Sequence, residues 1–298
     1  MKKIGLALLF IVLGLACSEQ RQYANPQNNV TENYFNFISS LQLPSELNFC
    51  GEKVPLDVPE VRERAEREFY LTLQQPGQVI LYLKRAGRYF PMFERIIKEN
   101  NMPDDLKFIA VAESALFMAR SSKDAVGMWQ FIEGTGRKMG LRIDTFVDER
   151  RHPEKSTLAA LNYLKQGYNI HKSWLLAAAG YNMGHTGVIS NLDFQGTDNY
   201  FELFLNEETS RYILRIIIIK EIMTNPEKYG FKISKNDIYT ESKVKLIECK
   251  VAIPNLAEWA KANGTTYKYV KLLNPWILGK NLPAPTKNDF YKIAVPDS

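Results

Sequence analysis

The chain has 298 residues and a net charge of +5, and 45% of its residues are hydrophobic and 24% charged. This is ordinary globular composition, with length for one large domain or two smaller ones. The positive charge is mild and evenly spread, which argues against a nucleic-acid-binding protein and leaves an anionic polymer as a compatible partner.

The N-terminus predicts a lipoprotein signal over residues 1–17. Two lysines precede an apolar run over residues 4–15 that is too short for a transmembrane helix. The small residues before Cys17 resemble the cleavage site of a bacterial lipoprotein, which would leave Cys17 as the acylated N-terminus. Ser18 resembles a signal for sorting to the outer membrane, so we expect a lipid anchor in the cell envelope, facing the periplasm. The alternative is a plain cleaved signal with a chance cysteine.

Residues 18–33 are polar and predict a flexible tether. Residues 34–89 are predicted to be an N-terminal helical extension. Its first part, over 34–60, is rich in proline and looks irregular, and helices are predicted over 61–69 and 78–100.

The next predicted helix begins at Pro103 and carries a carboxylate on an apolar face. Leu106, Ile109, Ala110 and Glu113 recur at the spacing of one helical stripe. A lone carboxylate among such neighbours is costly to ionise, so its pKa should rise. A carboxylic acid that stays protonated near neutral pH can act as the general acid that breaks a glycosidic bond. The alternative is a buried structural acid bonded to the backbone.

Further helices are predicted over 156–166, 174–181 and 208–223, and no strand is expected before residue 230. The fold class is therefore mainly α. The isoleucine run at 216–219 is short and flanked by charges, so it predicts a buried core helix and not a membrane span.

After residue 226 the composition changes to that of a small βααβ unit. Alternating residues predict a strand over 243–251, two short helices follow over 255–263 and 266–273, and a last strand is predicted over 291–295.

Four short motifs then carry a family resemblance. They are Glu113-Ser114, Gly127-Met128-Trp129-Gln130, Tyr181-Asn182 and Glu208-Thr209-Ser210-Arg211-Tyr212. In this order and spacing they resemble lytic transglycosylases of glycoside hydrolase family 23, and within it the membrane-bound lytic murein transglycosylase D group. The resemblance implies a lysozyme-like catalytic domain of the goose-type or soluble lytic transglycosylase kind over 90–230.

The resemblance also implies a reaction and its site. The family cleaves the β-1,4 bond between N-acetylmuramic acid and N-acetylglucosamine in peptidoglycan without water. Glu113 would protonate the bridging oxygen and then act as base on the muramoyl C6 hydroxyl, which attacks C1 and gives a 1,6-anhydro end. One carboxylate is then enough, whereas ordinary glycosidases use two, because the nucleophile is tethered to the substrate. The alternatives are a hydrolytic muramidase on the same scaffold and a catalytically silent glycan-binding lipoprotein.

By the same resemblance, the substrate-binding residues are Ser121, Gln130, Tyr181, Asn182, Glu208 and Tyr212. Counting forward from the glutamate gives Ser122 in place of Ser121, and we favour Ser121. Several have structural alternatives: Asn182 could brace a turn, Glu208 could favour the helix start, and Tyr212, Trp129 and Phe131 could be core. No cofactor or metal is expected, because the three histidines (His152, His171 and His185) lack the spacing of metal ligands and are assigned to loops.

Residues 244–296 resemble a divergent LysM module, a βααβ unit that binds glycans containing N-acetylglucosamine. The alternative is an appendage that packs on the catalytic domain. The expected partners are therefore peptidoglycan glycan strands and, through acylated Cys17, a lipid bilayer. An oxidising periplasm permits a disulfide between Cys50 and Cys249, and two free thiols are the alternative.

Overall fold

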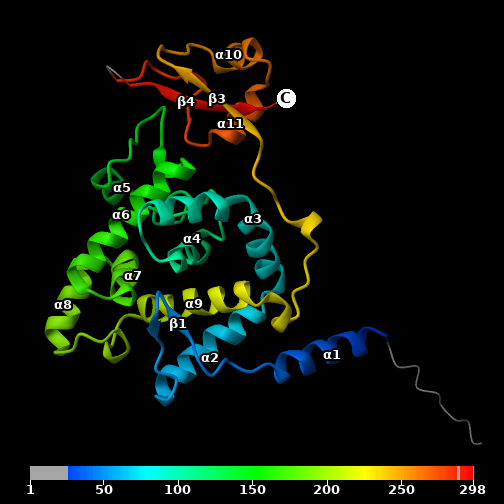
Figure 1. Ribbon diagram of the computed structural model, residues 1–298, viewed down its shortest axis with the longest axis vertical. Helices are drawn as coiled ribbons and strands as arrows, with labels where there is room; N and C mark the ends of the chain where they lie inside the picture. Colours follow the sequence, from blue (N-terminus) through cyan, green and yellow to red (C-terminus); the bar gives the residue numbers. More distant parts are fainter. Residues whose placement is uncertain (1–25, 287–288, 298) are drawn as a thin grey trace, which may run out of the picture. The chain divides into compact units, whose positions relative to one another are not determined.

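The computed structural model describes residues 26–286 and 289–297 (Figure 1). The chain divides into two compact units, of which one ends at Gln42 and the other begins at Leu43. The described part of the first unit is helix α1, Pro26–Ser40. Residues 26–33, which the sequence assigns to a tether, are thus helical. The predicted signal sequence with Cys17, and residues 18–25, lie outside the described residues.

The second unit opens with a small hairpin that the sequence analysis missed. Strands β1 (Asn48–Phe49) and β2 (Glu52–Lys53) pair antiparallel. Their turn is made by Cys50 and Gly51, both at positive φ. The expectation of no strand before residue 230 is therefore wrong, since two-residue strands are too short to leave an alternating pattern. Helices α2 (Pro59–Leu73) and α3 (Pro76–Glu99) follow and confirm the two predicted helices.

Six further α-helices follow before the C-terminal module within the described residues: α4 (Lys107–Ser114), α5 (Glu133–Lys138), α6 (Pro153–His171), α7 (Trp174–Met183), α8 (His185–Gln195) and α9 (Glu207–Thr224). Short 3-10 turns lie between or after them: η1 (Asp104–Leu106), η2 (Glu149–Arg151), η3 (Tyr200–Glu202), η4 (Pro226–Tyr229) and η5 (Lys235–Asp237). The sequence analysis missed α8, in which Val188 is the buried residue and no apolar stripe exists.

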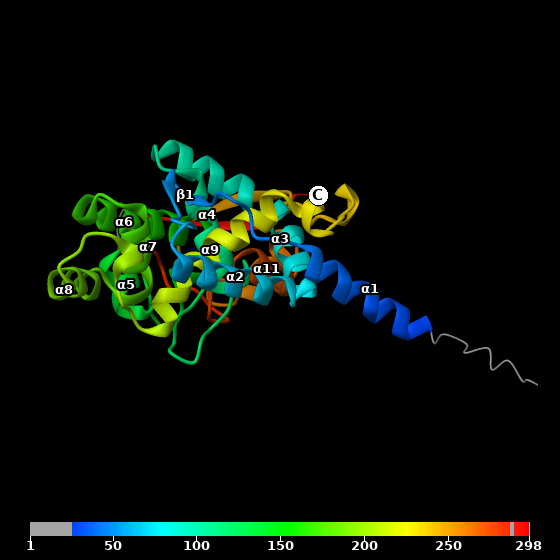
Figure 2. The same ribbon diagram turned by 90° about the horizontal axis from the view of Figure 1, so that it is seen from below.

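Helix α9 is the central helix of this part. It packs against α2, α4 and α7, and it lies between α2 and α4 in both views (Figures 1 and 2). Its four isoleucines at 216–219 are at most 2% exposed, which confirms the predicted core helix. Within the described residues, no helix combines the length and hydropathy needed to cross a membrane.

The C-terminal module confirms the predicted βααβ order. Strand β3 (Val244–Cys249) pairs antiparallel with β4 (Tyr291–Pro296), with Val244 opposite Pro296 and Cys249 opposite Tyr291. Helices α10 (Leu256–Ala262) and α11 (Tyr267–Leu273) lie between the strands. Both begin at a side-chain cap, Asn255 and Thr266, each of which accepts a hydrogen bond from a backbone N–H of the first turn.

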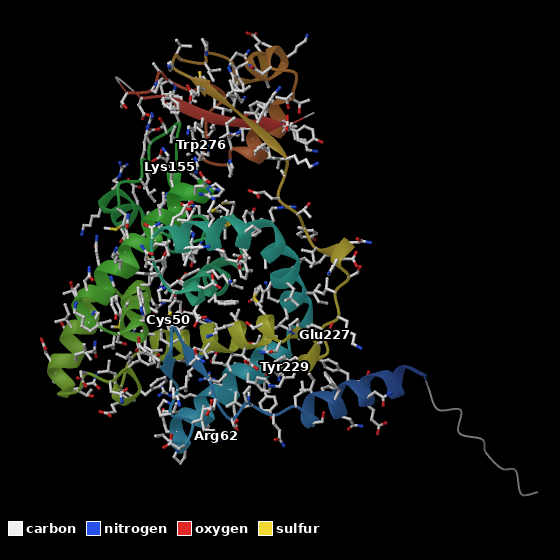
Figure 3. The ribbon with its side chains drawn as sticks, in the orientation of Figure 1. Cys50, Arg62, Lys155, Glu227, Tyr229 and Trp276 are labelled. Carbon is white, nitrogen blue, oxygen red and sulfur yellow. The ribbon has the colours of Figure 1, made fainter. Side chains whose placement is uncertain are left out.

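The two described cysteines are free thiols, so the disulfide alternative is not realised. Cys50 lies in the turn of the β1–β2 hairpin, away from Trp276 of the C-terminal module, as Figure 3 shows. Cys249 is buried in that module. Burial and the neighbouring charge of Asp105 raise the pKa of the Cys50 thiol, so this group is not a reactive thiolate.

Candidate active site

Helix α4 holds Glu113 in its last turn. Leu106, Ile109 and Ala110 are fully buried on the predicted stripe, and Glu113 is half-buried. The helix ends because Ala115 adopts a left-handed conformation, with φ 56°, and donates its N–H to the carbonyl of Val111. Leu116 is also left-handed, with φ 57°. Two successive non-glycine residues in this region are uncommon, and they turn the chain sharply away just after the acid.

The hydroxyl of Tyr212, on α9, donates a hydrogen bond of 2.5 Å to Oε1 of Glu113. Burial raises the pKa of Glu113 to about 7, while the Tyr212 hydrogen bond and the charge of Arg215 lower it and the charge of Glu208 raises it. The expected rise in pKa is thus present and has the expected cause. Near neutral pH this carboxyl group exists in both protonation states, so it can donate a proton and take one back.

Hydrogen bonds to backbone carbonyls tie the first and third motifs to the second. Ser114 Oγ donates to the carbonyl of Met128 at 2.8 Å, and the hydroxyl of Tyr181 donates to the carbonyl of Trp129 at 2.7 Å. Trp129 is fully buried and its indole N–H donates to Thr157 Oγ1 at 2.9 Å. Trp129 and Phe131 are therefore core residues, as the structural alternative held.

Two residues predicted to contact substrate, Ser121 and Gln130, form hydrogen bonds with the backbone of their own loop. Gln130 has φ 50°, and its side-chain amide donates to the carbonyl of Gly127 at 2.6 Å. Ser121 Oγ accepts hydrogen bonds from the backbone N–H groups of Lys123 and Ala125. Both side chains are half-buried, and their hydrogen bonds go to the loop and not to Glu113, so their contacts with substrate stay predictions. Ser122 is exposed.

The motif residues on α7 and α9 are joined to each other. Thr209 Oγ1 donates to Asn182 Oδ1 at 2.8 Å, which joins α7 to α9, and a contact of Asn182 with substrate stays a prediction. Asn206 caps α9 by accepting from the N–H of Thr209. Glu208 lies in the first turn of α9, is exposed, and pairs with Arg215 at 2.9 Å. Its charge raises the pKa of Glu113, and its contact with substrate stays a prediction.

Sequence reasoning missed three residues around the acid. Arg215 acts on Glu113 by its charge. Arg85, on α3, donates to the carbonyl of Ala115 at 2.9 Å, and its guanidinium lies 5.3 Å from the ring centre of Phe117. Phe117 is 58% exposed. No motif could have identified Arg85, because the chain brings it beside Ala115 only through the packing of α3 on α4.

Other features of the described residues lie apart from Glu113. A cavity of about 560 Å³ lies beside the β1–β2 hairpin and the start of α2, lined among others by Asn48, Lys53 and Arg62. No group of three or more His, Cys, Asp or Glu side chains in the described part of the chain could hold a metal ion. The assignment of the histidines to loops is wrong for two of them, since His171 ends α6 and His185 begins α8.

Comparisons with known proteins match two parts of this chain to family models. Residues 90–204 match the transglycosylase SLT domain, and residues 245–298 match the soluble lytic transglycosylase C-terminal LysM-like domain. The chain is 29% identical over 244 residues to "Membrane-bound lytic murein transglycosylase D" of Escherichia coli (strain K12), a match that covers 79% of this chain and 53% of that protein. The protein of the same name from Escherichia coli O6:H1 matches with the same values. The chain thus spans about half the length of these relatives.

Proposed function

We propose that this protein is a peptidoglycan lytic transglycosylase. Its residues 90–204 match the transglycosylase SLT domain, and its residues 245–298 match a LysM-like domain. Its reaction cleaves the β-1,4 bond between N-acetylmuramic acid and N-acetylglucosamine without water and leaves 1,6-anhydro ends. The observation that carries the proposal is the half-buried Glu113, with its pKa near 7 and its hydrogen bond from Tyr212, inside the matched domain.

In the proposed mechanism Glu113 acts twice. Its protonated carboxyl gives the proton to the bridging glycosidic oxygen, and the bond to C1 breaks with the electron pair leaving on that oxygen. The carboxylate then takes the proton of the muramoyl C6 hydroxyl, whose oxygen bonds to C1. Glu113 ends the cycle protonated, so atoms and charges balance. A pKa of about 7 suits both steps, and the tethered hydroxyl supplies the high effective concentration that intramolecular attack provides.

We assign the predicted substrate contacts to this reaction as part of the same proposal. Tyr212 orients the carboxyl group, because its hydroxyl donates to Oε1 and leaves Oε2 for the substrate. Ser121, Gln130, Tyr181, Asn182 and Glu208 are the proposed sugar contacts. The hydrogen bonds that hold Gln130 and Tyr181 in place support rigid positions for both side chains.

The proposed location is the cell envelope, with acylated Cys17 as the lipid anchor and peptidoglycan glycan strands as the partner. The name of the two Escherichia coli relatives, "Membrane-bound lytic murein transglycosylase D", supports this location. Glycan binding by the LysM-like domain is a further part of the proposal, supported by its βααβ fold and its matched family.

The product separates the proposed activity from its alternative on the same scaffold. Purified sacculi digested with the protein should release muropeptides that are one water lighter than hydrolysed ones, measured by mass spectrometry. Products of hydrolytic mass would assign a muramidase, and no release with retained binding would assign a silent glycan-binding protein. A Glu113→Gln variant with wild-type release would remove the acid from the mechanism.

A further inference from the structure

A hairpin of the catalytic domain forms part of the core of the LysM-like module. Residues Ile143 and Asp148 pair across this hairpin, and its outer edge pairs with Ile277 of the module through Val147. The N–H of Asp148 donates to the carbonyl of Trp276 at 2.9 Å, and the N–H of Leu278 donates to the carbonyl of Phe146 at 2.8 Å. Backbone hydrogen bonds therefore join residues 276–278 of the module to residues 146–148 of the hairpin.

We call this junction the seam (Phe146, Val147, Trp276, Ile277 and Leu278). The side chains of Val147, Trp276 and Ile277 are buried in it. Val147 is fully buried and belongs to the same apolar cluster as Ile293 and Val295 of the module. His152 stacks on Trp276 with ring centres 5.7 Å apart. A side chain at Gly279 would meet Phe146 at 3.2 Å. A movement of the module should therefore be passed on to the residues packed against it, because closely packed interiors have low compressibility.

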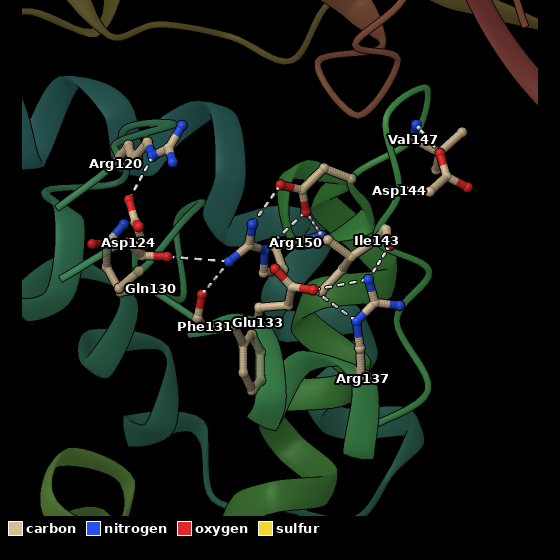
Figure 4. Close-up of polar contacts among 12 residues, drawn as sticks. Arg120, Asp124, Gln130, Phe131, Glu133, Arg137, Ile143, Asp144, Val147 and Arg150 are labelled. Atoms are coloured by element: carbon tan, nitrogen blue, oxygen red, sulfur yellow. Dashed lines mark hydrogen bonds and ion pairs between the residues drawn. The ribbon is translucent and has the colours of Figure 1, made fainter.

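A buried ion pair, Asp148–Arg150, connects the seam to the loop over residues 124–131, which we call the active-site loop. Asp148 accepts two hydrogen bonds from the guanidinium of Arg150, from Nε at 2.9 Å and Nη2 at 2.8 Å. Nη1 of Arg150 donates to two carbonyls of the loop, those of Asp124 at 3.1 Å and Phe131 at 3.2 Å (Figure 4). The side chains of Arg150 and Asp148 are 9% and 6% exposed, so water cannot replace these bonds.

The backbone of Arg150 also supports this loop. Gly127 has φ +89°, and a Cβ there would lie 2.0 Å from the carbonyl oxygen of Arg150, so only glycine permits this approach. The loop between Asp124 and Phe131 is the one whose carbonyls bind Ser114, next to Glu113, and Tyr181. A continuous set of contacts thus joins Trp276 and Ile277 to the surroundings of the acid.

We propose that the LysM-like module fixes the active-site loop (residues 124–131) through the buried Asp148–Arg150 pair, which makes Arg150 a positioning residue for Glu113. Glycan bound to the module would then act, through these contacts, on the loop beside Glu113. The expected effect on turnover rests on the proposed function. The effect of the module on the order of the loop does not, and it can be measured without substrate.

The effect on the order of the loop is tested by amide hydrogen exchange on the full chain. Val147→Ala loosens the seam, and Val295→Ala is its matched control, because both valines are fully buried in the same cluster and Val295 lies outside the seam. The amides of Val126 and Phe131 are hydrogen-bonded to each other's carbonyls within the loop, and that of Gly127 to the carbonyl of Ala119. We expect these three amides to exchange about tenfold faster in Val147→Ala than in Val295→Ala. Equal rates in the two variants would overturn the proposal.

The role of Arg150 is tested with Arg150→Lys, which keeps the charge and loses the fork that binds two carbonyls and a carboxylate. Arg120→Lys is the control, since Arg120 contacts the exposed side chain of the same Asp124 (Figure 4). We expect faster loop exchange and a lower kcat with little change in KM in Arg150→Lys alone. The Val147→Ala/Arg150→Lys double variant should exchange no faster than Arg150→Lys, and additive effects would contradict the coupling.

The two proposals fail separately. If the wild type releases no anhydro muropeptides while the exchange differences hold, the function is wrong and the coupling stands. If Arg150→Lys does not fold, the comparison of the two valine variants decides the matter by itself.

Discussion

The hydroxyl of Tyr212 lies 2.5 Å from Oε1 of Glu113, although 99 positions separate the two residues in the chain. Tyr212 is 1% exposed, so the hydrogen-bond partner of its hydroxyl is the carboxyl group of Glu113 and not water. The bond lowers the pKa of Glu113 against the larger opposing effect of burial. The protonation state of the acid is therefore set jointly by α4, which buries it, and α9, which supplies the donor.

Glu113→Gln should reduce turnover of peptidoglycan by at least about 10²-fold, the scale of a lost general acid. The amide keeps the shape of the side chain but cannot donate a proton of suitable acidity. Release of anhydro muropeptides measures the loss, and circular dichroism checks the fold. Turnover within a few-fold of the wild type would show that another group is the acid.

The stability of the protein should fall as the pH rises from about 4.5 to about 7, because Glu113 keeps its proton in the folded state after the unfolded chain has lost it. The difference between 4.5 and 7 corresponds to about 3 kcal/mol at most. Denaturant unfolding at pH 4.5 and pH 8 should show this component in the wild type and not in Glu113→Gln. Parallel pH profiles for the two proteins would contradict the raised pKa.

Tyr212→Phe should raise the pKa of Glu113 further, because the hydroxyl that stabilises the carboxylate is lost while burial remains. The alkaline limb of the kcat/KM profile, which follows loss of the proton from Glu113, should move to higher pH. The rate at the optimum should fall as well, since the carboxyl group loses its orienting partner. A limb that stays in place would separate Tyr212 from the acid's titration.

Glu208→Gln should move the same limb in the opposite direction. The charge of Glu208 raises the pKa of Glu113, whereas that of Arg215 lowers it. Removing the carboxylate leaves Arg215 without its 2.9 Å partner, which lowers the pKa of Glu113 still more. Because the pair is exposed, the shift should shrink as salt is added. A shift to higher pH would show that Glu208 acts by contact with substrate and not by its charge.

Asn274→Leu should destabilise the LysM-like module by about 1–3 kcal/mol, the cost of leaving buried backbone groups unpaired. Asn274 is 1% exposed, donates to the carbonyls of Val270 and Ala294, and accepts from the N–H of Ala294. Its amide thus joins α11 to β4. Thermal unfolding measures the change, with Asn281→Leu outside this contact as the control. Equal melting temperatures for the two variants would contradict the assigned role.

Much of the fold was predictable because local sequence patterns indicate its helices and strands. The 3.6-residue stripe of α4, the isoleucine-rich α9 and the capped helices of the βααβ module each carry their own signal. The β1–β2 hairpin and α8 do not, since the strands have two residues each and α8 buries little more than Val188. Those elements form because neighbouring elements hold them.

The sequence by itself determined the apolar helix that carries Glu113, the isoleucine-rich core helix and the βααβ order of the C-terminal module. Only the tertiary structure decided which side chains surround Glu113 and which hold the loop beside it. Arg85, Arg215 and Arg150 reach their positions through contacts between elements far apart in the chain. Periodicity reports what a residue buries on its own helix, whereas the partner of a buried charge depends on how the helices pack.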